Sequence, residues 1–276
     1  MHWAAAVRSR CGWTRRGKPW APRCSRLKSK PMILLSNRQG RLLELTLNRP
    51  EKRNALNAEL CRELVQALEQ ADADPATNAV LLTANGKSFC AGMDLSQDPS
   101  GLAEIHNRLF TLGARTGKPL VAAVQGAALA GGTGLVANAH VAIAAEEATF
   151  GLTEIRIGLW PFLIFRAVAA AIGERRALEL SLTGRTIGAA EAQAWGLVHQ
   201  VVPAPELVGR ARELALGIAS ASPAAIQAGL AYLRDARVLG WEEAGRLAAQ
   251  AREAIFGSAE FQEKVRALLT KRPPPA

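Results

Sequence analysis

Apolar residues recur with two different periods in the first two-thirds of the chain, and these periods predict alternating strands and helices. Short extended runs at 33–36 and 42–47, joined by the polar segment 37–40, predict a hairpin. Asn57 then stands where a helix N-cap is expected, ahead of apolar positions three and four residues apart that continue to about Asp72. The chain therefore opens with a hairpin and an amphipathic helix.

Three later runs, 79–83, 120–124 and 141–145, are apolar along their whole length. Such runs are typical of strands that are covered on both faces, as in a parallel sheet. A helix is expected at 101–114, and the glycine-rich segment 127–134 opens a second, shorter one. Strands that alternate with helices in this way predict an α/β layered fold with mainly parallel pairing.

The pattern changes after about residue 187, where the sequence becomes alanine-rich and largely helical, with one short strand expected at 198–202. Apolar faces of helical period occupy four segments: 205–219, 223–234, 241–255 and 258–269. We expect this tail to act as a lid or an oligomerisation element. The predicted organisation is a leader (1–31), an α/β core (32–200) and a helical C-terminal region (201–276).

The composition allows a large buried core, because 49% of the 276 residues are hydrophobic. No stretch approaches the roughly 18 uninterrupted apolar residues that a membrane-spanning helix needs. The longest candidate, 120–145, is interrupted by glycine and polar residues and is interpreted as buried core. We therefore expect no membrane partner.

The net charge of +10 is concentrated at the N-terminus. Residues 1–31 contain nine basic residues and no Asp or Glu, which leaves 25 basic against 24 acidic residues in the rest of the chain. A nearly neutral body does not favour nucleic-acid binding. The leader fits either an organellar transit peptide or a start site placed before the true one at Met32, and we expect it to be disordered. We therefore expect a cytoplasmic protein, or a mitochondrial-matrix protein if the leader is a transit peptide.

The four cysteines do not have the spacing of a metal site, so we expect no metal and a reducing compartment. Cys90 lies beside a loop that carries candidate chemistry, but no histidine is near it in sequence. A small buried hydrophobic side chain is therefore favoured over a nucleophile at this position.

Two loops rich in small residues follow predicted strands, at 88–94 and at 127–134. Ligands of α/β proteins usually bind at this end of the strands. Glycine lets a ligand approach the main chain closely, and the N–H groups that open a helix favour negative charge. Two such loops on adjacent strands can direct two N–H donors at one oxygen, which is an oxyanion hole. The alternative is that these glycines only make tight turns.

Glu154 stands in an otherwise apolar stretch between Gly151 and Gly158. Burial there raises the pKa of a carboxyl group and makes it a competent base near neutral pH. The alternatives are a solvated glutamate or a partner for Arg156. Glu146 and Glu147, in the preceding turn, are interpreted as solvated.

Six segments, taken together and in order, resemble the enoyl-CoA hydratase/isomerase (crotonase) family. They cover most of the chain from residue 33 to 275. The segments are LNRPEKRNALN (47–57), SFCAGMDL (88–95), AAVQGAALAGG (122–132), ATFGLTEIRIGLWP (148–161), LTGRTIGAAEAQAWGLVHQVV (182–202) and LLTKRPPP (268–275).

The resemblance implies a crotonase-like spiral of ββα units with a helical C-terminal region, assembled as a homotrimer or homohexamer. It implies that the N–H groups of Met93 and Gly131 hold the thioester oxygen of an acyl-CoA, with Glu154 as the proton-transferring group. Coenzyme A is then part of the substrate, and no separate cofactor is expected. The positions implied to contact coenzyme A are Lys52, Arg53, Ala55, Leu56, Cys90, Ala91 and Lys271.

One departure from the family pattern bears on the reaction. Family hydratases carry a second glutamate in the helix that the glycine run opens, and here that position is Gly134. Hydration usually needs two carboxylates, whereas a single base can move a double bond between the 3,4 and 2,3 positions. The stretch 159–162 also looks closer to the family's isomerases. Isomerisation is therefore favoured; the alternatives are an enoyl-CoA hydratase of fatty-acid or amino-acid degradation and a weakly catalytic CoA-thioester-binding protein.

Overall fold

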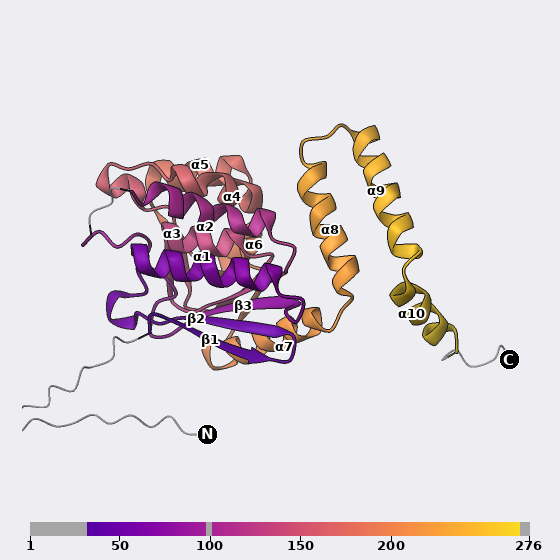
Figure 1. Cartoon of the computed structure of the whole chain (residues 1–276). Coiled ribbons are helices and arrows are strands. Elements are labelled where there is room, and N and C mark those ends of the chain that lie inside the picture. The colour runs from indigo at the N-terminus through magenta and orange to yellow at the C-terminus, as the bar shows by residue number, and fades with distance from the viewer. Residues whose placement is uncertain (1–31, 98–100, 271–276) are drawn as a thin grey trace, which may run out of the picture. The chain divides into compact units, whose positions relative to one another are not determined.

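The computed structural model describes residues 32–97 and 101–270 (Figure 1). The predicted leader, 1–31, and the predicted CoA contact Lys271 lie outside the described residues. Within the described chain, strands and helices alternate up to about residue 202, and only helices follow.

Two sheets form the α/β part. The larger has six strands in the order β1-β2-β3-β4-β6-β9, and the smaller has three in the order β5-β7-β8. Only the β1–β2 and β7–β8 pairs are antiparallel. The strands are β1 (Leu34–Gln39), β2 (Leu42–Leu47), β3 (Ala79–Ala84), β4 (Leu120–Val124), β5 (Ala127–Leu129), β6 (Val141–Ala145), β7 (Thr149–Gly151), β8 (Thr186–Gly188) and β9 (Gln200–Val202).

Helices cover both faces of the larger sheet (Figure 1). Because successive strand residues point to opposite faces, alternate apolar residues of β3 and β4 enter two different cores. One core lies under α7, and the other lies under α1 to α6. The helices are α1 (Ala58–Ala73), α2 (Ala103–Arg115), α3 (Gly131–Asn138), α4 (Phe162–Ile172), α5 (Glu174–Thr183), α6 (Ala189–Trp195), α7 (Leu207–Ala219), α8 (Pro223–Ala236), α9 (Trp241–Phe256) and α10 (Ala259–Thr270).

The strands and helices agree closely with the periodic segments of the sequence. Asn57 caps α1 as expected, because its side-chain oxygen accepts a hydrogen bond from the Leu60 N–H at 2.9 Å. The turn of the first hairpin is tighter than predicted. Strand β1 continues to Gln39, and the left-handed φ of Gly40 (+57°) allows a two-residue turn. Residues 127–129, predicted as part of a loop, form strand β5.

The C-terminal helices differ from the rest of the fold in having no buried core. None of the described residues of α8, α9 and α10 is buried, although α8 and α9 contact each other. Trp241, at the start of α9, is 96% exposed. The apolar faces that predicted these helices are thus left largely uncovered within one chain.

No single helix in the described ranges is long and apolar enough to cross a membrane. By length and composition alone, the segments Ala204–Ala219 and Pro223–Ala236 together could cross one, but they are bent by 98° relative to each other. The first of these segments contains α7, whose apolar residues pack on the larger sheet.

Candidate active site

Main-chain hydrogen bonds join the loop that follows β2 to the loop that follows β3. The Leu56 N–H donates to the Gly92 carbonyl oxygen at 2.8 Å, and the Asp94 N–H donates to the Leu56 oxygen at 3.0 Å. The Ala91 N–H donates to the Arg53 oxygen, also at 3.0 Å. Residues 53–56 and 91–94 therefore run side by side as a short ladder.

The second of these loops is joined in turn to β5. The Cys90 N–H donates to the Ala127 oxygen at 3.1 Å, and the Leu129 N–H donates to the Cys90 oxygen at 2.9 Å. The approach is close, since a Cβ on Gly132 would lie 2.1 Å from the Cys90 oxygen. Glycine is required at 132 for this reason, and the two glycine-containing loops of the sequence meet as predicted.

A buried ion pair braces the first ladder. The Arg49 guanidinium donates to an Asp94 carboxylate oxygen at 2.9 Å, and both side chains are buried. The other Asp94 oxygen accepts from the Ser96 hydroxyl at 2.6 Å. That hydrogen bond, together with Arg49, lowers the pKa of Asp94 and keeps it ionised. The pair holds the loop that carries Met93.

The N–H groups of Met93 and Gly131 are free to bind an external oxygen. Neither donates a hydrogen bond within the described part of the chain. Gly131 opens α3, and the first N–H groups of a helix lack partners inside the helix. A Cβ on Gly92 would lie 3.5 Å from the Gly131 nitrogen, so the two loops touch next to the donors.

Backbone strain orients the second donor. Ala130 has φ 50° and ψ −119°, a conformation that a residue with a Cβ rarely adopts, and its N–H donates to the Gly151 oxygen at 2.8 Å. Ala130 is thus held by the β7 segment, while the next N–H, that of Gly131, is left free. The two free N–H groups and the helix start suit an oxygen that gains negative charge.

Glu154 is buried as predicted. It opens the 3₁₀ turn Glu154–Ile157, is 9% exposed, and its Oε2 has no hydrogen-bond partner within the described chain. Loss of solvation raises the pKa of its carboxyl group to about 7. Arg156 makes no ion pair with it in the described structure and is exposed. A carboxyl group with this pKa can accept and return a proton near neutral pH.

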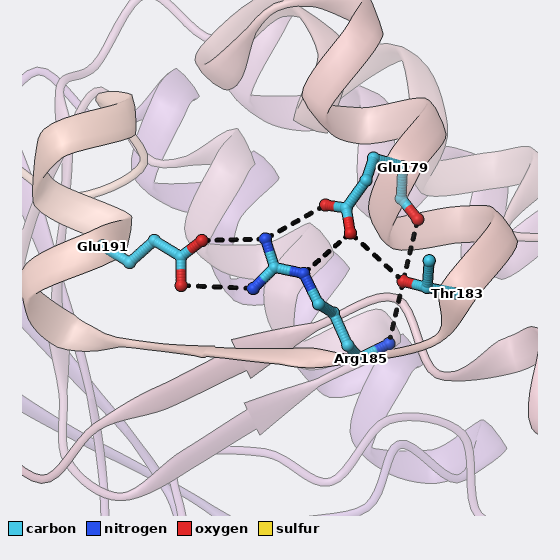
Figure 2. A network of polar contacts seen from close by, with 4 residues as sticks. All are labelled: Glu179, Thr183, Arg185 and Glu191. Atoms are coloured by element: carbon cyan, nitrogen blue, oxygen red, sulfur yellow. Dashed lines mark hydrogen bonds and ion pairs between the residues drawn. The ribbon is translucent and has the colours of Figure 1, made fainter.

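A network of hydrogen bonds and ion pairs around Arg185 lies next to the 3₁₀ turn that begins at Glu154 (Figure 2). The Arg185 guanidinium bridges Glu179 of α5 and Glu191 of α6, with its shortest contacts at 2.7 and 2.8 Å. The neighbouring Gly184 lies against the 3₁₀ turn, where an added Cβ would be 2.8 Å from a methyl carbon of Ile155. The network therefore fixes the surface on which the Glu154 turn rests.

Met93, Gly131 and Glu154 line one cavity of about 370 Å³. Its other walls are mostly apolar and come from α2 and from residues 157–164. None of the described lining residues belongs to the C-terminal helices, for which a role as a lid or an oligomerisation element was expected. Those helices follow α7 in the chain, and of them α8 contacts α2.

The predicted CoA contacts divide into two groups. Leu56 and Ala91 line the cavity, whereas Ala55 and Cys90 do not. Burial raises the pKa of the Cys90 thiol to about 12, which agrees with a small buried side chain and not a nucleophile. Lys52 and Arg53 are exposed beside the cavity-lining Leu56.

The side chains around Gly134 leave no room for a side chain at this position. A Cβ at this position would lie 2.4 Å from Cγ2 of Ile164 and 3.1 Å from Cε1 of Phe110. The side chains of α4 and α2 already fill the space that a second glutamate would need. Sequence reasoning did not identify Ile164, because nothing in its local pattern shows what it faces.

Three further lining residues, His106, Phe110 and Trp160, were also not identified as site residues. The apolar period of α2 marks Phe110 as buried but does not show that this face borders a cavity. His140 and His199 have structural roles, because the Nδ1 atom of each accepts a backbone N–H.

Known proteins are similar to this chain over most of its length. The sequence profile described as enoyl-CoA hydratase/isomerase matches residues 37–275. Enoyl-CoA hydratase EchA19 of Mycobacterium tuberculosis is 38% identical, over 87% of this chain and 94% of its own. The 2,3-dehydroadipyl-CoA hydratase of Escherichia coli is 35% identical, over 87% and 97%. The crystal structure of an enoyl-CoA hydratase of Mycobacterium smegmatis has a TM-score of 0.84 at 31% identity, over 89% and 99%.

Replacement of Glu154 by Gln is expected to stabilise the fold in a pH-dependent way. The pKa of Glu154 is about 7 in the folded chain against an ordinary value of 4.5. Below pH 4.5 the group is protonated in both states and contributes nothing. Between pH 4.5 and about 7 the unfolded chain loses this proton while the folded chain keeps it, so the free energy of unfolding falls across that range by at most about 3 kcal/mol and changes no further above it. Urea unfolding at pH 8 is therefore expected to show a more stable variant, and the gain should vanish near pH 4.5.

Glu146→Gln is the matched control, because this side chain is exposed in a turn eight residues earlier. Its free energy of unfolding should stay within about 0.5 kcal/mol of the parent at both pH values. Equal stability of Glu154→Gln and the parent at pH 8 would show that Glu154 is not a desolvated carboxylate.

Proposed function

Because this chain belongs to the enoyl-CoA hydratase/isomerase family, we propose that its cavity moves protons on enoyl-CoA thioesters with Glu154 as the single acid–base group. The chain is an enzyme of this family that processes acyl-CoA, and it has the crotonase fold. The proposal concerns which reaction it favours. It rests on the steric exclusion of a side chain at Gly134, which leaves Glu154 as the only carboxylate among the described lining residues.

The favoured reaction is the conversion of a 3-enoyl-CoA to a 2-enoyl-CoA. The thioester oxygen accepts hydrogen bonds from the N–H groups of Met93 and Gly131. The Glu154 carboxylate removes a proton from C2, the C2–H electron pair forms the enolate, and negative charge develops on the oxygen. The 3,4 double bond then moves to 2,3 as the same proton is returned to C4. Each oxyanion donor contributes a rate factor of about 10²–10³.

Hydration is the second candidate, because the matched relatives include proteins named as hydratases. That reaction adds water at C3 and a proton at C2, work that is usually shared by two carboxylates. The side chains of Ile164 and Phe110 stand where the second carboxylate would project. This steric block supports isomerisation as the better fit to the cavity.

Coenzyme A itself is proposed to lie along the first ladder. Lys52 and Arg53 present exposed cationic groups next to Leu56 and Ala91, which line the cavity. Cations suit the phosphate groups at the nucleotide end of the substrate. Lys271 remains a proposed contact from the C-terminal segment.

A homotrimer or homohexamer is proposed to cover the C-terminal helices. The α8–α9 pair has an apolar groove lined by Ala228, Tyr232, Ile255 and Phe256, among others, and no described residue of this pair is buried. Uncovered apolar surface of this kind marks an association site. Light scattering of the purified chain should give three or six times the chain mass of 29.4 kDa, and a monomer at micromolar concentration would contradict the proposal.

Glu154→Gln is the direct test of the reaction. We expect kcat for 3-enoyl-CoA esters to fall by about 10²–10⁴-fold while binding of acyl-CoA is retained. In the parent enzyme, kcat/KM should rise with pH through about 7, as Glu154 of the free enzyme loses its proton. Glu147→Gln, an exposed neighbour, serves as the control. Unchanged turnover of both 3-enoyl-CoA and 2-enoyl-CoA in Glu154→Gln would refute the role of Glu154. Binding without turnover in the parent would favour a non-catalytic CoA-ester-binding protein.

Restoring a second carboxylate should need two changes and not one. Gly134→Glu alone is expected to destabilise the chain, because its Cβ would meet Cγ2 of Ile164 at 2.4 Å and Cβ at 2.9 Å. With Ile164→Gly added, space opens, and the ratio of hydration to isomerisation should rise at least about tenfold over that of Ile164→Gly alone. Assays of both reactions on one enoyl-CoA pair measure the ratio. An unchanged ratio in a folded double variant would contradict the steric explanation.

A further inference from the structure

The cavity contains a second titratable group that the proposed reaction does not use. Among the described residues that line it, Glu154 and His106 are the titratable ones, and neither Lys nor Arg is present. Most of the remaining wall is apolar. An imidazole is unusual in a cavity wall that is otherwise largely apolar.

His106 lies in the first turn of α2 and is 7% exposed. Its Nε2 is buried and has no hydrogen-bond partner within the described chain. Burial lowers the pKa of the imidazole, so the ring is neutral near pH 7 and can offer one N–H donor and one acceptor. A buried polar atom without a partner is costly, and a ligand that supplies the partner recovers that cost.

His106 is connected to the proposed oxygen site through Phe110. Its ring lies 6.0 Å from the ring of Phe110, one helical turn along α2. Phe110 in turn reaches the oxyanion-hole loop, because its Cζ is 3.2 Å from where a Cβ on Gly131 would stand. The chain of contacts runs from the proposed oxygen site at Gly131 through Phe110 to His106. The imidazole is thus linked through Phe110 to the proposed oxygen site and lies on the α2 wall of the cavity.

We propose that His106 recognises an uncharged oxygen, a hydroxyl or a carbonyl, carried on the acyl chain beyond the reacting carbons. This rests on the proposed function only in that an acyl-CoA occupies the cavity. A carboxylate at the same place is disfavoured, since no described cation lines the cavity and an unpaired buried charge is far more costly than an unpaired dipole. The substrate class is thus an oxygen-substituted enoyl-CoA and not a plain alkenoyl one.

The contribution of His106 is to selection between substrates. A site that hydrogen-bonds a substrate oxygen discriminates against the analogue without it, because the buried polar group of the site is then left unpaired. One such hydrogen bond to a neutral group corresponds to a preference of about tenfold.

Binding of unreactive saturated CoA esters tests this independently of catalysis. Titration calorimetry would compare hexanoyl-CoA with its 4-hydroxy, 5-hydroxy, 6-hydroxy and 5-oxo derivatives. In the parent protein, at least one oxygenated ester should bind about tenfold more tightly than hexanoyl-CoA. In His106→Phe, which keeps an aromatic ring beside Phe110, this preference should disappear while hexanoyl-CoA binds as well or better. His106→Gln should retain part of the preference, and His106→Leu replaces the Phe variant if that variant does not fold.

Two results overturn the proposal: no oxygenated ester is preferred by the parent, or the preference is the same in the Phe or Leu variant. Either result leaves the Glu154 mechanism intact, because that mechanism is measured by turnover of 3-enoyl-CoA. Conversely, loss of the Glu154 role does not affect a binding preference measured with saturated esters.

Discussion

The close contact between two main-chain loops is the constraint on which the rest of the site depends. Gly92 and Gly131 approach so closely that a Cβ on Gly92 would lie 2.8 Å from that of Ala130. Only this approach brings the free N–H groups of Met93 and Gly131 to one cavity. The Arg49–Asp94 pair, the Cys90–β5 hydrogen bonds and the strained Ala130 all serve to hold it. Main-chain donors suit this role, because they are fixed before the substrate arrives and need no reorganisation.

The space that a second carboxylate at position 134 would need is occupied by other side chains. A glycine at 134 could leave a hole for water, but Ile164 and Phe110 fill it. Ile164 and Phe110 therefore leave no room for a water molecule in the place of the missing Cβ. Glu154 consequently stands as a lone carboxylate whose pKa is set by burial and not by a charged partner. In the proposed function, this one steric contact favours isomerisation over hydration.

Selectivity and catalysis are assigned to different elements of the fold. The proposed oxygen site lies where the loop after β3 meets the junction of β5 and α3, which main-chain hydrogen bonds join. Glu154 belongs to a turn that rests on the α5–α6 network. The acyl wall comes from α2 and the start of α4, which do not carry the proposed catalytic groups. Changes in those helices can therefore alter the substrate without disturbing the oxygen site.

Much of this protein was determined by its sequence alone. Period and composition predicted most strands and helices, including the Asn57 cap, because local hydrogen bonding and amphipathicity are local properties. The six segments predicted the family, which the comparisons confirm, and the two glycine-containing loops predicted where the main chain of one loop meets that of the other.

Tertiary structure decided what those patterns could not express. The segment 162–186 gave no element prediction, and β5, a three-residue strand, was too short to show a period. That Ile164 occupies the space at Gly134, and that His106 borders the same cavity as Glu154, depends on how α2 and α4 cross α3. Burial at a cavity is a property of elements far apart in the chain, whereas the periods of a sequence describe one element at a time.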